Sequence, residues 1–410
     1  MVIIGILLAW LLMATMTIIW RHGATLQALW LEPVVRRPIL IFESDDWGPG
    51  EATHAQRLRQ LAETLAKFSD AGGSHPIVTL GMVMAIPDRR RMQEQDGRQY
   101  AALTLADERF AEMRDVIREG VRQGVMAVQL HGMEHYWPPA LMAAAKKDEA
   151  VASWLNNEFP RTEGLPAPLQ SRWIDASVLP SQTHAQEQIE PAVKEEVGFF
   201  MRVFAGGPSV VVPPTFVWSR DVERAWAQNG VRAIVTPGRR FEGRDARGKL
   251  ISSSMTIRNG MRTAEGLVYM VRDDYFEPAK GHRAERAWAA LEVKTRCGRP
   301  TLLEMHRFNF VDDPALAERS YQELARVVEG ALQRYPSLVF MSTEALVGAM
   351  AEKQASLIAS GMLARVQAWC WRVRQEALVW RAARFTGLAL LILLLQRCVA
   401  ASARAPQVRV

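Results

Sequence analysis

Three short motifs contain side chains that could act in catalysis or bind a metal ion. Two adjacent carboxylates, Asp45 and Asp46, follow an apolar run. Two histidines four residues apart, His131 and His135, follow a second run, and His306 ends a third. In an acid pair of this kind one carboxylate can ligate a metal while its neighbour acts as a general base. For the acid pair alone, a solvated surface turn is the alternative.

The histidine pair indicates a metal site. Side chains four residues apart meet on one face of a helical turn, so we expect both imidazoles to reach one cation. With Asp46 they form a set of two histidines and one carboxylate, which suits zinc, cobalt, nickel or iron. We expect one divalent ion, zinc ahead of the others. His306 can protonate a leaving amine or alcohol near neutral pH, and a hydrogen-bonded histidine at a pocket rim is its alternative.

Further side chains near the same motifs are candidates for binding a substrate. They are Trp47, Pro214, Trp218, Arg272 and Arg307. Trp218 offers a flat face to a sugar ring, and the proline stiffens a loop that would form a groove wall. Arg272, Asp273 and Asp274 could orient the acid histidine. A core position for Trp218 and a solvated ion pair for Arg272 are the alternatives.

The elements that must position these residues alternate between short apolar runs and helical patterns across residues 36–350. This alternation is typical of βα units around a largely parallel sheet. The expected strands are 38–43, 76–85, 125–130, 209–213, 231–236, 266–271, 300–305 and 337–341. The clearest helical patterns cover 106–123, 221–229 and 314–334. The sequence therefore predicts an α/β fold, an irregular (β/α)7-type barrel, whose chemistry takes place where strands end.

Both ends of the chain carry membrane-associated patterns. Residues 1–22 predict an N-terminal transmembrane anchor, because the first 20 contain no charged side chain and about 20 apolar residues cross a bilayer. A cleaved signal peptide is the alternative. Residues 355–384 predict a basic amphipathic helix in the headgroup layer. The apolar segment at 385–401 could cross, dip into the membrane or be buried, and 402–410 is a tail.

Charge and composition restrict the partners. The chain has 410 residues and a formal charge of +6, and many of its arginines flank the C-terminal apolar stretches. That placement favours anionic lipid headgroups, and we expect no nucleic-acid partner. The positions of Arg21, Arg36 and Arg37 after the first apolar stretch favour a catalytic domain on the cytoplasmic side of a bacterial inner membrane over the periplasmic side. Three widely spaced cysteines exclude a thiolate metal site.

The order of the motifs resembles the polysaccharide deacetylases, which contain the NodB-homology domain and form carbohydrate esterase family 4. An acid pair, an HxxxH pair, the proline pair at 213–214 and a late histidine follow in the family's order over residues 36–350. The resemblance implies a NodB-like barrel in which Asp45 is the general base and His306 the general acid. It implies that the metal ligands are Asp46, His131 and His135.

The same resemblance implies an activity. A metal-bound water would hydrolyse an acetyl or formyl group from an N- or O-acylated sugar. That sugar would belong to an envelope polysaccharide, a glycan or a lipid-linked precursor. Two departures mark a divergent branch: Glu-Ser-Asp-Asp-Trp-Gly replaces Thr-Phe-Asp-Asp-Gly, and Val212 replaces an arginine that pairs with the base in the family. Arg272 or Arg307 would then set the charge of Asp45.

Three other functions are compatible with the sequence. The first is a glycan-binding protein on the same barrel without hydrolysis, and the second is a membrane assembly protein in polysaccharide export. The third is a different hydrolase, such as an amidase that acts on a small non-sugar molecule. The presence of both a base and an acid candidate favours an enzyme, because a binding protein needs neither.

Overall fold

The computed structural model describes residues 2–404, and the chain divides into two compact units. The sheet unit comprises Leu40–Ala290 and Thr301–Gly348. The terminal unit comprises Met1–Ile39, Leu291–Pro300 and Ala349–Val410. All of the predicted catalytic and metal-binding residues therefore belong to the sheet unit.

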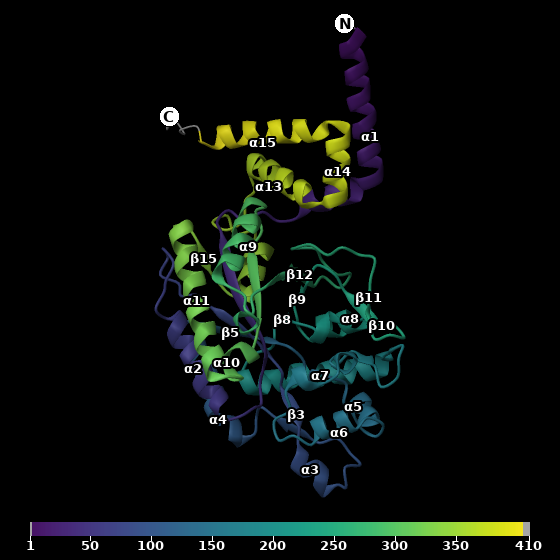
Figure 1. Cartoon of the computed structure of the whole chain (residues 1–410), viewed down its shortest axis with the longest axis vertical. Helices are drawn as coiled ribbons and strands as arrows, with labels where there is room; N and C mark the ends of the chain where they lie inside the picture. The colour runs from purple at the N-terminus through teal and green to yellow at the C-terminus, as the bar shows by residue number, and fades with distance from the viewer. Residues whose placement is uncertain (1, 405–410) are drawn as a thin grey trace. The chain divides into compact units, whose positions relative to one another are not determined.

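A nine-stranded sheet forms the core of the sheet unit over the described residues (Figure 1). Its order is β12-β9-β8-β5-β2-β1-β14-β13, the pairings along this order are parallel, and β15 pairs with β1. The strands are β1 Ile39–Trp47, β2 Val78–Met82, β5 Met126–Leu130, β8 Val210–Val211, β9 Ala233–Thr236, β12 Val268–Val271, β13 Asp274–Tyr275, β14 Thr301–His306 and β15 Val339–Phe340. Each of the eight predicted strands corresponds to one of these, and β13 was not predicted.

The two edges of the sheet come close together. Strands β12 and β13 form opposite edges, yet only Arg272 and Asp273 separate them in the chain. Since consecutive Cα atoms are about 3.8 Å apart, the facing ends of these strands lie within roughly 11 Å. The sheet therefore curls almost into a closed barrel, which confirms the predicted α/β barrel class. Arg272 lies at this seam.

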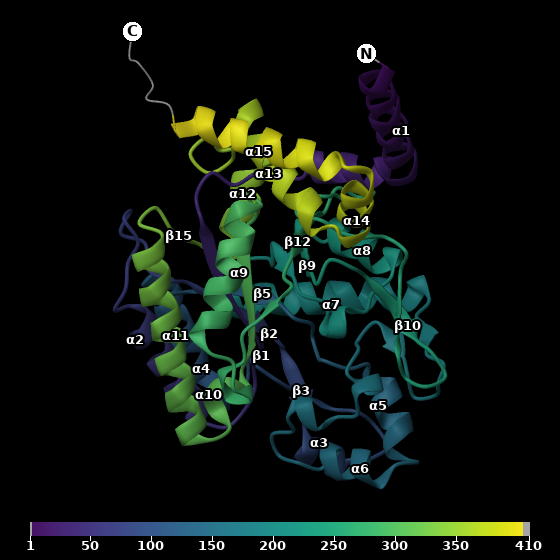
Figure 2. The same ribbon diagram turned by 45° about the horizontal axis from the view of Figure 1, so that its top comes forward.

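Helices cover the sheet and bury their apolar sides. Strand β1 is buried along its whole length, as expected for a parallel strand that is covered on both faces. In α4, Met113, Val116 and Ile117 are buried at the spacing of one helix face. Figures 1 and 2 show α2, α4 and α11 together beside the sheet, with α7 and α8 in another layer. The bounds of these helices are α2 Thr53–Leu65, α4 Ala111–Arg122, α7 Gln186–Phe204, α8 Arg220–Gln228 and α11 Pro314–Arg334.

Shorter elements complete the sheet unit. The remaining helices are α3 Arg89–Glu94, α5 Pro138–Ala145, α6 Glu149–Leu155, α9 Ala284–Arg296, α10 Phe308–Val311 and α12 Thr343–Ala351. The 3-10 turns are η1 Glu108–Phe110, η2 Thr162–Gly164, η3 Ala167–Leu169, η4 Pro214–Phe216 and η5 Pro278–Lys280. There are also three antiparallel strand pairs. They are β3 Ala85–Pro87 with β4 Ala102–Thr104, β6 Ile174–Asp175 with β7 Gln182–Thr183, and β10 Phe241–Arg244 with β11 Leu250–Ser252. The β10–β11 pair forms part of the wall of the pocket described below.

The terminal unit contains α1 Val2–Leu31, α13 Met362–Gln375, α14 Ala377–Thr386 and α15 Leu388–Arg404. Among the described residues, α1 is the one single helix that is long and apolar enough to cross a membrane. Helix α14 and the segment Leu388–Val399 pass the same test only as a pair that is bent by 104°. Gly387 makes this break, with a left-handed φ of 81°. The segment expected at 385–401 is therefore a broken helix.

Helix α13 differs from the predicted headgroup helix in one respect. Arg372 is fully buried, and its guanidinium donates hydrogen bonds to five carbonyl oxygens within the terminal unit. These carbonyls belong to Leu29, Glu32, Pro33, Cys297 and Gly298. A guanidinium that is engaged in this way stabilises the packing of the unit, so Arg372 is not available to lipid headgroups.

Candidate metal centre and active site

Asp45 and Asp46 lie at the carboxyl end of β1, where the strand is irregular. The register between β1 and β2 shifts between Ser44 and Trp47, and Asp46 has a φ of 69°. Neighbouring side chains of a regular strand point to opposite faces, whereas a bulge with a left-handed residue redirects one of them. Both carboxylates therefore line the same pocket.

The loop that follows β5 carries His131 and His135. This loop corrects the expected helical turn, because residues 131–137 are not helical and the chain turns at Gly132 with a φ of 109°. A Cβ atom on Gly132 would lie 2.8 Å from the carbonyl oxygen of Glu134, so the turn requires glycine. The two histidines converge through this turn instead of through a helix.

A buried polar network holds that loop in place. Arg172 forms ion pairs with Glu134 and, at 3.3 Å, with Glu196. The backbone N–H of Met133 donates to Glu196 Oε2 at 3.2 Å, and Trp226 Nε1 donates to Glu196 Oε1 at 2.8 Å. Burial raises the pKa of Glu196 to about 7, against the lowering effect of Arg172. The network therefore links the histidine loop to α7 and α8.

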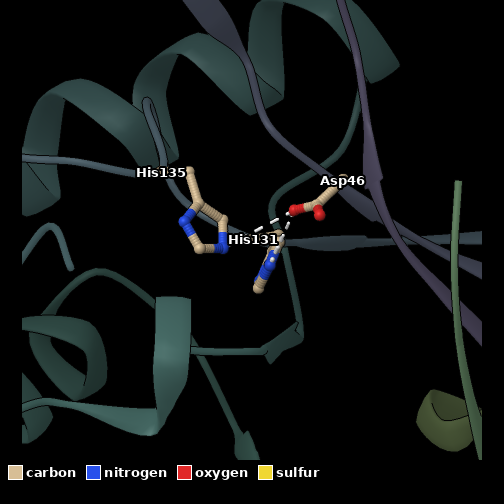
Figure 3. Close-up of side chains that lie close together, drawn as sticks. All are labelled: Asp46, His131 and His135. Carbon is tan, nitrogen blue, oxygen red and sulfur yellow. Dashed lines mark ion pairs between the residues drawn. The ribbon is translucent and has the colours of Figure 1, made fainter. Parts of the chain in front are cut away.

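Three ligand atoms converge on one point (Figure 3). His131 Nε2 and His135 Nε2 lie 3.4 Å and 3.5 Å from Asp46 Oδ1. These separations are longer than charge-assisted hydrogen bonds, which measure about 2.7–2.9 Å. Ligand atoms at about 2.0–2.1 Å from a tetrahedral zinc ion would lie roughly 3.3–3.4 Å apart. The spacing of the three atoms therefore fits a shared ion.

The hydrogen bonding of these residues also fits a metal ion. His131 Nδ1 donates to the carbonyl oxygen of Val212 at 2.7 Å, which leaves the lone pair on Nε2. Asp46 Oδ1 is buried without a hydrogen-bond partner among the described residues. Burial lowers the pKa of His135 to about 4, which keeps its imidazole neutral. Burial would also lower the pKa of His131, but the charge of Asp45 raises it, so a proton competes with a metal for His131.

A second group of possible ligands, Asp45, Glu304 and His306, lies beside the first. Arg272 Nη2 donates to Asp45 Oδ2 at 2.5 Å, and Arg272 Nε lies 3.3 Å from Glu304 Oε2. A fixed guanidinium at these distances repels a cation. The first group is therefore the better candidate for a metal site, and the second is suited to acid–base chemistry.

Arg272 determines the charge of Asp45. It is fully buried and also donates to Glu43 Oε2 at 2.7 Å. Burial by itself would raise the pKa of Asp45, but the charges of Arg272 and His131 outweigh burial, so this pKa lies below its usual range. Asp45 Oδ1 has no hydrogen-bond partner in the described part of the chain. Asp45 is therefore an ionised carboxylate with one oxygen available to accept a proton.

Glu277 holds His306 in its protonated form. His306 Nδ1 hydrogen-bonds to Glu277 Oε1 at 2.6 Å, and Asn309 Nδ2 donates to the other carboxylate oxygen. The ring of His306 stacks on Phe308 with centroids 5.7 Å apart. Burial alone lowers the pKa of His306, but the hydrogen bond that its Nδ1 donates to Glu277 and the charge of Asp46 raise it to about 10. His306 is therefore a proton donor at neutral pH.

A pocket of about 740 Å³ opens over both groups. Asp45, the three metal-binding side chains and His306 all line it, together with the turn at Thr215 and Phe216. These two residues have left-handed φ values of 52° and 57°, and such strained backbone often marks a functional site. The volume lies within the range of small-molecule sites, about 300–1,000 Å³.

The structure places the five predicted substrate contacts outside this pocket. Trp218 is 1% exposed and its indole N–H donates to Glu223, so it is a core residue and presents no face to a sugar. Trp47 is fully buried, donates to Ser44 Oγ and stacks on Phe310. Pro214 is buried as well. All three side chains are therefore part of the core and not of the pocket surface.

The two predicted arginines are also buried. Arg307 is 6% exposed and donates to the carbonyl oxygen of Pro49, and Arg272 acts on Asp45 as described above. The structure thus pairs Arg272, and not Arg307, with the candidate base. Asp273 and Asp274 were expected to orient the acid histidine, but Glu277 does so.

Three site residues were missed at the sequence level. Glu43 and Glu304 each stand two positions before a site residue on a strand, and they are paired across β1 and β14. Because side chains two apart on a strand share a face, this spacing could have identified both. Glu277 follows β13 in an irregular segment, and no local pattern indicates its role.

The sequence matches no protein-family model, and it matches none of the curated proteins. A family 4 acetyl xylan esterase from Clostridium thermocellum, solved with a cobalt ion, is 10% identical with a TM-score of 0.36 and covers 76% of this chain and 90% of its own. Peptidoglycan deacetylase PdaC from Bacillus subtilis is 9% identical with a TM-score of 0.35, over 78% of this chain and 95% of its own.

A third similar structure is a CE4 family pseudoenzyme from Bacillus anthracis. It is 9% identical with a TM-score of 0.33 and covers 74% of this chain and 63% of its own. The similar structures thus include a family 4 acetyl xylan esterase, a peptidoglycan deacetylase and a CE4 family pseudoenzyme.

Proposed function

We propose that the protein is a metal-dependent hydrolase that removes an acetyl or formyl group from an N- or O-acylated sugar. One observation carries the proposal. The convergent nitrogens of His131 and His135 and the carboxylate of Asp46 share a pocket with a carboxylate held ionised and a histidine held protonated. Acyl hydrolysis requires a base that takes a proton from the attacking water and an acid that gives one to the leaving atom.

The reaction can be described through the side chains of this chain. A metal ion held by Asp46, His131 and His135, zinc ahead of cobalt, nickel or iron, would lower the pKa of a water molecule and polarise the acyl carbonyl. Asp45 Oδ1 accepts a proton from the attacking water, while Arg272 fixes the other oxygen. The water oxygen bonds to the acyl carbon.

His306 completes the turnover. As the bond between the acyl carbon and the sugar nitrogen or oxygen breaks, His306 Nε2 gives its proton to that leaving atom. Glu277 keeps Nδ1 engaged, so the proton that moves is the one on Nε2. No covalent enzyme intermediate is needed, and the products are a free carboxylic acid and a deacylated sugar.

Metal analysis and turnover on the same preparations test the proposal. The purified full chain should contain one divalent metal ion, and the double variant His131→Ala/His135→Ala should lose it while keeping its circular dichroism spectrum. His75→Ala is the matched control, because His75 hydrogen-bonds to a carbonyl oxygen of Phe68 outside the pocket. Asp45→Asn should keep the metal and lose about two to four orders of magnitude in turnover.

The outcomes separate the alternatives. Unchanged metal content in the double variant would contradict the site. Metal binding without release of acetate or formate from any acylated sugar, polymeric or lipid-linked, would favour the glycan-binding alternative. Release from a small amide that is not a sugar would favour the different hydrolase.

We also propose that α1 anchors the protein in a bacterial inner membrane with the sheet unit on the cytoplasmic side. The support is the apolar length of α1 together with Arg21, Arg36 and Arg37 that follow its apolar stretch. On that side the substrate would be a lipid-linked sugar precursor, and lipid would be a partner of the terminal helices.

A further inference from the structure

One wall of the pocket carries an unpaired, buried positive charge. Arg244, at the end of β10, lines the pocket and is only 5% exposed. Its Nη1 donates to the carbonyl oxygen of Gly248 at 2.9 Å, and its Nε has no hydrogen-bond partner. Within the described residues 2–404 no carboxylate forms an ion pair with it.

Three other buried arginines of the sheet unit each have a carboxylate partner, whereas Arg307 donates to the carbonyl oxygen of Pro49. Arg172 pairs with Glu134, Arg272 pairs with Asp45, and Arg240 pairs with Glu223 at 3.0 Å. A buried charge without a counter-ion is strongly unfavourable, and proteins normally pair such a group or bind an ion to it. Burial lowers the pKa of Arg244 with no acid to oppose it. The charge of Arg244 thus requires a partner that the chain does not supply.

Two more basic residues line the same pocket. Arg239 is exposed on the loop before β10, which a hydrogen bond from Thr236 Oγ1 to the carbonyl oxygen of Arg239 holds in place. Lys280 lines the pocket at η5, with its ammonium 4.5 Å from the ring centre of Phe308. Phe241 and Leu250 pack the β10–β11 hairpin onto a small core, so the wall that carries Arg244 is anchored.

The acids of the same pocket do not neutralise this wall. Asp45 and Glu304 contact Arg272, and Asp46 faces the two metal-binding histidines. Glu163 lies on the exposed η2 turn and, among the described residues, forms no ion pair with Arg239 or Arg244. Asp273 is exposed and has an interaction of its own. Arg239 and Arg244 therefore line the pocket without an ion pair to any of these acids.

We propose that Arg244 and Arg239 form an anion-binding subsite, and that the acylated sugar carries a phosphate or a carboxylate apart from the acyl group that reacts. This inference rests on the proposed function, whose substrate class it narrows. A guanidinium donates two parallel hydrogen bonds to either kind of anion, which fixes orientation as well as charge. The subsite selects acidic or phosphorylated acyl-sugars over neutral polysaccharides.

The test measures binding to the metal-free full chain by titration calorimetry. The probes are N-acetylglucosamine 1-phosphate, N-acetylglucosaminuronic acid and, as a neutral reference, the methyl glycoside of N-acetylglucosamine. Removing the metal prevents the anions from binding to the ion itself. We expect at least one anionic probe to bind about tenfold or more tightly than the neutral one, with an advantage that falls as salt rises. The stronger of the two anionic probes identifies phosphate or carboxylate as the group recognised.

Three variants assign the preference to residues. Arg244→Gln and Arg239→Gln should each reduce the anionic advantage by about tenfold, which is typical for the loss of one charged hydrogen-bonding partner. Arg247→Gln should leave it unchanged, because Arg247 is an exposed arginine of the same hairpin that does not line the pocket. Arg239 is exposed, so its variant gives a result even if Arg244→Gln fails to fold.

Equal affinity for charged and neutral probes, or an equal loss in Arg247→Gln, would overturn the subsite. The proposed function is judged separately, by metal-dependent acyl release from the same probes. Acyl release without charge preference removes the subsite and keeps the function. Charge preference that depends on Arg244 and Arg239, without acyl release from any sugar, keeps the subsite and removes the function.

Discussion

Replacing Arg272 with methionine tests how the barrel ionises its base. The side chain is fully buried at the seam between β12 and β13, and its guanidinium contacts Glu43, Asp45 and Glu304 at 2.7, 2.5 and 3.3 Å. Methionine is also a long, unbranched side chain, so it fills much of the same space, but it has no hydrogen-bond donor. Three buried carboxylates would then share a space with no positive charge between them.

The expected loss of stability is about 3–5 kcal/mol, the usual cost of removing one partner from a buried ion pair. Although Arg272 has three carboxylate partners, the loss of stability should not reach three times that value. Burial already raises the pKa values of Glu43 and Glu304, so both can take up protons instead. Carboxylates whose pKa is raised by folding stabilise the protein below their unfolded pKa, near 4, and lose that contribution as pH rises. The gap between wild type and Arg272→Met should therefore widen from pH 5 to pH 8.

Activity gives the sharper result. Arg272 is the main group that lowers the pKa of Asp45, so without it burial dominates and that pKa rises. The acidic limb of the pH–rate profile should then move to higher pH, with turnover partly recovered in alkaline buffer. Arg240→Met is the matched control, since Arg240 is also buried and paired, with Glu223, but lies away from Asp45. An acidic limb that stays at the wild-type pH in Arg272→Met would refute the assignment, even if the protein is destabilised.

Three further changes can be tested. Glu277→Gln should lower the pKa of His306 from its value of about 10, so the alkaline limb of the pH–rate profile should move to lower pH; an unmoved limb would remove Glu277 from this role. Gly132→Ala should weaken metal affinity by about tenfold or more in a chelator competition, because alanine does not tolerate a φ of 109° and the histidine loop would shift. Alkaline phosphatase fused at Glu163 should be inactive in cells, and activity there would place the sheet unit in the periplasm.

The local pattern of the sequence was sufficient to predict the strands and the types of side chain at the candidate metal site. All eight predicted strands are present. A strand that is buried on both faces is a continuous apolar run, and such a run can be recognised in the sequence. The spacing of His131 and His135 indicated two imidazoles within reach of one ion. The prediction of a helical turn between them was wrong, since it depended on helix geometry and not on the conformation of Gly132.

Only the tertiary structure decided how these groups act. The bulge at Asp46 turns two adjacent carboxylates toward one pocket, which the alternation of a regular strand does not predict. The counter-ion of Asp45 is Arg272, 227 residues away, and the two meet because the sheet curls until its edges approach. The sequence does not distinguish a Trp218 that faces a sugar from one in the core, and the structure buries it, with its indole N–H donating to Glu223. Residue types and the local periodicity of apolar residues can be read from the sequence, whereas charge pairing and burial depend on contacts that form only when the barrel closes.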